Sequence, residues 1–250
     1  MKKTTTNRAL VVGAIVTAAG SGHAFGQVAE LPQSGVTLDQ LIGGQFRVRD
    51  KLFTITSFST PTQGPSFDPA SFNITPFVAG NPFNGIGFDI NGPIQDLVRG
   101  DAFISDFTLQ YTVEIVDDPN TAIDESDPSN GYAIVDNRLN FNGTAGGEPG
   151  SLVRVVEDVF NFETGELIGQ KEVFDIIRGE GDEDTQLEDF LEFDPLTKIS
   201  VVKDVEAFAA TDCCDATISF IRQSFSQVPS PGGVAVLGAM GFTASRRRRA

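Results

Sequence analysis

The feature that most constrains the fold of this 250-residue chain is a strict alternation of apolar and polar side chains. In its clearest instance, five apolar residues alternate with polar ones along a single extended segment: Phe107, Leu109, Tyr111, Val113 and Ile115. A period of two is typical of a β-strand with one face in a core and the other in solvent. The segment is therefore predicted to be a half-buried antiparallel strand.

Similar alternation recurs along the chain, so about nine strands are predicted. The other eight runs cover residues 46–58, 72–78, 85–90, 132–141, 152–160, 167–177, 196–208 and 217–225. In the first run the apolar parity switches, which places a bulge or tight turn at Asp50 and Lys51. Between residues 160 and 168, Gly165 is expected at a positive φ in a hairpin connection.

Helical patterns are short and rare. Only residues 38–42 and 187–191 suggest helical turns, whereas 26 Gly and 13 Pro favour many turns between strands. We therefore expect an all-β fold, an antiparallel β-sandwich of about nine strands. Residues 27–227 would form this domain.

The N-terminal 26 residues have the pattern of a secretory signal peptide. Lys2, Lys3 and Arg8 precede an apolar stretch over residues 9–19, and small residues allow cleavage after Ala24 or after Gly26. An uncleaved anchor is the less favoured alternative, because the stretch is about half the roughly 20 residues of a spanning helix. Export is the expected consequence.

Residues 228–250 form a second address with three parts. Val228, Pro229, Ser230 and Pro231 precede a short apolar segment over residues 233–244, and a basic cluster follows it: Arg246, Arg247, Arg248 and Arg249. A helix over these residues would span only about 18 Å at about 1.5 Å per residue, which makes a marginal anchor. The arginines would stay on the cytoplasmic side and stop translocation. This pattern indicates a transient stop in the inner membrane, and the alternative is a solvated basic tail.

This tail resembles the PEP-CTERM sorting signal, in a variant with Ser230 where the usual motif has Glu. The resemblance implies an exosortase as processing partner, in bacteria that make exopolysaccharide. The body is also similar to ectodomains of PEP-CTERM surface proteins, through loose motifs around residues 38–53 and 199–229. The resemblance transfers no catalytic residue.

Charge and residue usage exclude several classes of function. All 34 acidic residues lie between the two ends, and the ends hold 7 of the 18 basic ones, so the body carries a net charge of −23. Such a surface repels nucleic acid. His23, the sole histidine, lies in the leader, so the mature chain is expected to lack a Ser-His-Asp triad and the usual catalytic zinc sites.

The two cysteines, Cys213 and Cys214, are adjacent, so no disulfide framework holds the fold. In an oxidising compartment they could form a strained vicinal disulfide, pair with another chain or remain free.

Two acidic segments could hold Ca²⁺, which prefers oxygen ligands. The denser one covers residues 180–194 and supplies the candidate ligands Asp182, Asp184, Glu188 and Asp189. The other covers residues 117–127. The alternative for both is a solvated acidic loop, and no other cofactor is expected.

These observations favour a non-enzymatic protein that is exported to the cell surface or matrix, with a structural or adhesive role among exopolysaccharide or surface glycans. A Ca²⁺-dependent glycan-binding module is the alternative. A third hypothesis is a polysaccharide hydrolase that uses two carboxylates, since 34 acids offer many pairs.

Overall fold

The computed structural model describes residues 28–229 except 62–65, 81–84, 97, 101–102, 123 and 128–130. The helical elements are the single turns α1 (Leu38–Leu41) and η1 (Pro69–Ser71). The strands are β1 (Val36–Thr37), β2 (Gln45–Val48), β3 (Lys51–Ser59), β4 (Asn73–Val78), β5 (Ile86–Gln95), β6 (Ser105–Ile115), β7 (Tyr132–Gly146), β8 (Leu152–Asn161), β9 (Leu167–Gly179), β10 (Asp182–Gln186), β11 (Glu188–Leu196), β12 (Lys198–Phe208), β13 (Asp215–Phe225) and β14 (Gln227–Pro229).

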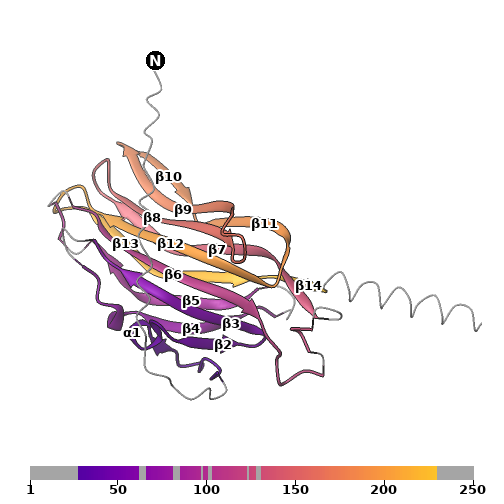
Figure 1. The fold of residues 1–250 in the computed structure, drawn as a ribbon. Helices are drawn as coiled ribbons and strands as arrows, with labels where there is room; N and C mark the ends of the chain where they lie inside the picture. Colours follow the sequence, from indigo (N-terminus) through magenta and orange to yellow (C-terminus); the bar gives the residue numbers. More distant parts are fainter. Residues whose placement is uncertain are drawn as a thin grey trace, which may run out of the picture.

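These strands form two seven-stranded sheets in which every pair is antiparallel (Figure 1). Sheet A has the order β10-β9-β8-β12-β6-β3-β2. Sheet B has the order β1-β4-β5-β13-β7-β11, and β14 also pairs with β7. One hydrophobic core contains residues from both sheets, so the fold is a β-sandwich.

Alternation along β6 shows why these residues form a sandwich. Its five predicted inward residues are all at most 4% exposed, whereas Gln110, between two of them, is exposed. The β6 register against β12 runs from Lys198 opposite Glu114 to Ala207 opposite Ser105 without a shift. A slip of one residue would turn the whole apolar face to solvent, so burial fixes this register.

Phenylalanine side chains join the two sheets. Phe53 of sheet A stacks on Phe46 with ring centroids 5.1 Å apart, and it meets Phe88 of sheet B edge to face at 5.2 Å. Phe225 of sheet B lies 5.9 Å from Phe53. Because all four rings are buried, this cluster contributes hydrophobic and aromatic packing energy across the sandwich.

The all-β prediction is confirmed, and the tight turns are close to where the sequence places them. Arg49, with φ of 58°, and Asp50 form the turn between β2 and β3. Gly165 has φ of 71° in the hairpin that joins β8 to β9. The short turn α1 lies within the predicted helical residues 38–42.

The prediction of about nine strands is too low, because the described residues form fourteen. The run over residues 46–58 contains two strands, and β1, β10, β11 and β14 were not predicted. The prediction of a helical turn over residues 187–191 is wrong, since residues 188–191 begin β11 and pair with β7. Tertiary pairing overrides its local pattern, which is a common outcome at sheet edges. Within the described residues, no helix is long and apolar enough to span a membrane.

Replacing Phe53 by Ala should lower the free energy of unfolding by about 3–5 kcal/mol, since it leaves a cavity between the sheets. Urea unfolding would measure this change. Phe162→Ala is the matched control, because that ring is 47% exposed and its removal, which loses a cation–π contact with Lys198, should cost no more than about 1 kcal/mol. Equal losses for the two variants would contradict the assignment of Phe53 to the core.

Candidate binding groove

A groove of about 690 Å³ lies on the outer face of sheet B. Strands β7 and β13 form its centre, because their alternate residues point away from the core. The lining residues are Phe77, Ala79, Gly85, Asp136, Arg138, Asn140, Phe141, Leu187, Glu188, Phe220, Arg222, Ser224 and Ser226. Its volume is in the range of sites that hold small ligands.

Small residues leave room at the floor of the groove. Gly85 has φ of 83°, and a Cβ there would lie 3.5 Å from the Phe77 ring and 3.7 Å from Ser224 Cβ. A larger residue at this position would be strained and would occupy the space beside Phe77. Ser224, opposite Gly87 in the β5–β13 register, adds only a hydroxyl. The floor of the groove is therefore free of large side chains.

One wall is a preordered stack of an arginine and aromatic rings. The Arg222 guanidinium carbon lies 3.9 Å from the centroid of the Phe77 ring and 5.6 Å from that of Phe220. Two hydrogen bonds of 2.8 Å join the same guanidinium to Asp89, and this contact raises the Arg222 pKa above its usual value. Because Arg222 is held on both sides, little side-chain entropy is left to lose on binding.

The opposite rim comes from β7 and β11. Arg138 lies over the Phe190 ring at 5.2 Å and forms an ion pair of 3.2 Å with Glu188. Arg138 and Glu188 are about half exposed, so this ion pair contributes little to stability. It balances the charge of the rim, while Leu187 and Phe190 present apolar surface to solvent.

Polar groups for a ligand lie between these walls. The side chains of Asn140 and Ser226 make no hydrogen bond within the described residues, whereas Asp136 accepts one of 2.8 Å from the Ser226 backbone N–H. Amides, hydroxyls and carboxylates together supply both donors and acceptors. With the aromatic stack beside them, they suit a ligand that has apolar ring faces and several hydroxyl groups.

Sequence reasoning did not select the groove residues. One signal was available in residues 217–225. The spacing of three between Ile218 and Ile221, which are both buried, breaks the alternation of apolar and polar residues. It corresponds to an irregularity in the pairing of β13 with β5 and β7 between Ile218 and Phe220. A bulge of this kind redirects side chains, and here Phe220 and Arg222 lie on the outer face.

The four candidate Ca²⁺ ligands are not brought together. Asp182 and Asp184 belong to β10 in sheet A, and Asp184 pairs with Arg178 at 2.6 Å. Glu188 and Asp189 belong to β11 in sheet B; Glu188 pairs with Arg138, and Asp189 accepts the Glu172 backbone N–H at 2.8 Å. The predicted acidic loop is a pair of strands that lie in different sheets.

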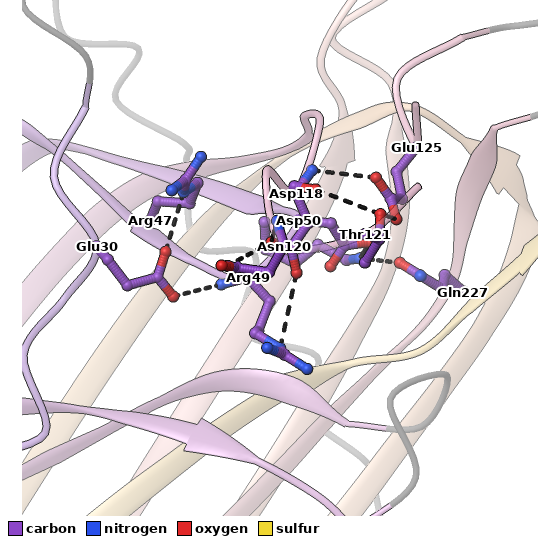
Figure 2. Close-up of polar contacts among 10 residues, drawn as sticks. Glu30, Arg47, Arg49, Asp50, Asp118, Asn120, Thr121, Glu125 and Gln227 are labelled. Atoms are coloured by element: carbon purple, nitrogen blue, oxygen red, sulfur yellow. Dashed lines mark hydrogen bonds and ion pairs between the residues drawn. The ribbon is translucent and has the colours of Figure 1, made fainter. Parts of the chain in front are cut away.

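The second acidic segment, residues 117–127, folds through its own carboxylates (Figure 2). Asp118 Oδ1 accepts hydrogen bonds from the backbone and side chain of Asn120, at 2.9 and 2.8 Å. Glu125 accepts the Asp118 backbone N–H at 3.0 Å and the Thr121 hydroxyl at 2.5 Å. Over the described part of the chain, no three His, Cys, Asp or Glu residues are grouped in a way that could hold a metal ion.

The cysteines lie directly before β13 and are unbonded in the structure, with Cys213 exposed and Cys214 buried. The Sγ atom of Cys214 accepts the Glu148 backbone N–H at 3.0 Å and lies 3.0 Å from the Thr211 hydroxyl. Only Cys213 is therefore open to a partner from solution.

Of the predicted sorting motif, Val228 and Pro229 lie in β14, paired with Ala133 and Tyr132 of β7. Ser230, Pro231 and the four arginines, Arg246, Arg247, Arg248 and Arg249, lie outside the described residues, as does the predicted signal peptide.

The chain matches no family model and no curated protein. Among solved structures it is similar to TmCBM61 in complex with beta-1,4-galactotriose, with 10% identity and a TM-score of 0.31 over 77% of this chain and 95% of that one. It also matches the enzymatically active domain of bacteriophage CBA120 tailspike protein 4, with 11% identity and a TM-score of 0.26, and the GH31 alpha-xylosidase from Xanthomonas citri, with 7% identity and a TM-score of 0.23. These two matches include 69% and 74% of this protein, but the aligned part is only 19% of the tailspike chain and 19% of the xylosidase chain. At such low TM-scores, functional assignment rests on the groove itself.

Proposed function

We propose that this protein is an exported β-sandwich that binds a neutral polysaccharide in the groove on the outer face of sheet B. The observation that carries this proposal is the stack of Phe77, Arg222 and Phe220 beside the side chains of Asn140 and Ser226, which make no hydrogen bond within the described residues. A sugar ring offers an apolar face to an aromatic side chain and hydroxyl groups to amides and carboxylates. Both kinds of contact are available in this groove.

Charge argues for a neutral rather than an ionic ligand. The body carries a net charge of −23, which disfavours polyanions. Within the groove, Arg222 is paired with Asp89 and Arg138 with Glu188, so neither guanidinium is left as an uncompensated anion site. A neutral glycan costs less desolvation than a charged one and keeps both ion pairs in place.

We further propose that the groove binds without catalysis. A glycoside hydrolase needs one carboxylic acid with a raised pKa and a second carboxylate across the scissile bond. Here Asp89 and Glu188 are each engaged in an ion pair with an arginine, so neither is placed as a free acid beside a ligand. Asp136 is also engaged, because it accepts the backbone N–H of Ser226.

The ends of the chain supply the proposed cellular context. An exported, acidic domain with a PEP-CTERM-like tail would be released or attached at the cell surface by an exosortase, after transient anchoring in the inner membrane. Strand β14 ends at Pro229, within the motif proposed for recognition. Its role there would be structural or adhesive, through contacts with exopolysaccharide or surface glycans.

Replacing Phe77 or Phe220 by Ala should weaken binding to the neutral fraction of the producer's exopolysaccharide by about tenfold each, the effect of losing about 1.4 kcal/mol of contact. Affinity electrophoresis in gels containing that polysaccharide would measure retardation. Phe162→Ala, an exposed ring on the β8–β9 hairpin, is the matched control and should be retarded like the wild type. Unchanged retardation of both groove variants, with folding intact, would rule out the groove as the binding site.

Processing can be tested in the native host by intact mass. The mature chain should begin at residue 25 or 27 and end close to Pro229. In a strain without the exosortase, the protein should keep the arginines at 246–249, because nothing removes the tail. Finding the same shortened chain in both strains would disprove exosortase sorting.

A further inference from the structure

Five polar side chains meet in the centre of the sandwich, where they are at most 1% exposed. Three of them lie side by side on the inner face of sheet A, in direct register: Lys171 of β9, Glu157 of β8 and Lys203 of β12. The other two, Asn137 of β7 and Gln223 of β13, face them from sheet B. The groove function makes no use of this core cluster.

The contacts of the core cluster form a closed ring. Lys203 Nζ donates to Glu157 Oε2, and Asn137 Nδ2 donates to Glu157 Oε1 at 2.6 Å. Gln223 closes the ring on the other side, because its Oε1 accepts from Lys203 Nζ at 2.8 Å and its Nε2 donates to Asn137 Oδ1. A primary amine and a carboxamide are thus held on both sides of one carboxylate.

The charges of the core cluster are unequal, with two lysines for one carboxylate. Lys171 Nζ lies 2.6 Å from Glu157 Oε1. Burial lowers the pKa of Lys171 to about 8 and also lowers that of Lys203, although Glu157 opposes both shifts. Burial alone would raise the Glu157 pKa, but the two lysines outweigh it and hold the value at about 2. A buried excess of positive charge favours the loss of a proton from a lysine amine.

We propose that Lys203 and Asn137 join in an intramolecular amide bond, with Glu157 as the catalytic acid and base. Lys203 transfers a proton to Glu157, and the neutral Nζ attacks Asn137 Cγ. Glu157 then protonates Nδ2 and accepts the second proton of the attacking nitrogen. The Cγ–Nδ2 bond breaks, ammonia leaves and takes up that proton as ammonium, and Glu157 returns to the carboxylate.

Asn137 is the acceptor because its leaving nitrogen contacts Glu157. The nitrogen of Gln223 instead donates to Asn137 Oδ1 and to the Arg138 carbonyl at 3.1 Å, so Gln223 cannot receive the proton from Glu157 directly. The Gln223 N–H is well placed to stabilise the negative charge that develops on Asn137 Oδ1 during attack. All five side chains are shielded from bulk solvent, which protects the reacting groups from hydrolysis.

The bond would join β12 of sheet A to β7 of sheet B. The two cysteines of this chain are adjacent and unbonded, so they provide no cross-link between the sheets. A covalent link at the centre of the core would restrict the unfolded chain in the way a disulfide does, while remaining resistant to reduction.

Peptide mapping of the purified full-length protein tests this proposal. We expect a tryptic peptide ending at Arg138 to be joined to a peptide in which Lys203 is uncleaved, with a mass about 17 Da below their sum, the mass of the ammonia lost from the acceptor amide. Mapping is required in addition to intact mass, because an N-terminal glutamine can also lose ammonia. Absence of joined peptides from the folded wild type would overturn the proposal, and a link through Lys171 would overturn the assignment of the nucleophile.

Variants test the roles of the three residues. Glu157→Gln, Asn137→Ala and Lys203→Met should each abolish the joined peptide. Lys198→Met, on the same strand but paired with Glu114, is the control and should keep it. If Glu157→Gln does not fold, Asn137→Ala removes the acceptor without leaving a charge unpaired, and mapping of the wild type remains decisive. Full cross-linking in folded Glu157→Gln would contradict catalysis by Glu157.

Discussion

The burial of Glu157 is the constraint on which the rest of the structure depends. An isolated carboxylate in a protein core is strongly destabilising, so the fold has to bring it partners. Lys171 and Lys203 supply the charges from neighbouring strands, and Asn137 supplies a hydrogen bond from the opposite sheet. These contacts fix the register of β9, β8 and β12 and the placement of sheet B above them. A slip in any of these strands would leave a buried charge without its partner.

Because side chains alternate across a sheet, the same polar residues determine what sheet B presents to solvent. Gln223 points inward, so Arg222 and Ser224 point outward; Asn137 points inward, so its neighbour Arg138 lies on the outer rim of the groove. The core cluster and the groove therefore lie on opposite faces of the same strands, β7 and β13. The rigid platform that we propose for glycan binding is a consequence of the polar contacts that hold the core together.

The sequence was sufficient for the strands with strong alternation, because that pattern reports burial directly. It failed for β10 and β11, whose acidic side chains lie at sheet edges. Strand β10 forms a hairpin with β9, and β11 pairs with the distant strand β7. The groove was not predictable for a related reason. Phe77 and Arg222 are far apart in the chain and come together only through the order β4-β5-β13, which periodicity does not reveal. The core cluster likewise needs both sheets, since Glu157 and Asn137 lie in different ones.

A titration of isotope-labelled protein with neutral oligosaccharides from the producer's matrix, followed by amide NMR, tests the central claim most directly. If the outer face of sheet B is the binding surface, the shifted amides should be those of Gly85, Arg138, Phe220, Arg222 and Ser224. Amides of sheet A and of residues 117–127 should keep their positions. Shifts confined to that loop or to sheet A, or no shifts at millimolar oligosaccharide, would contradict a glycan-binding role for this face.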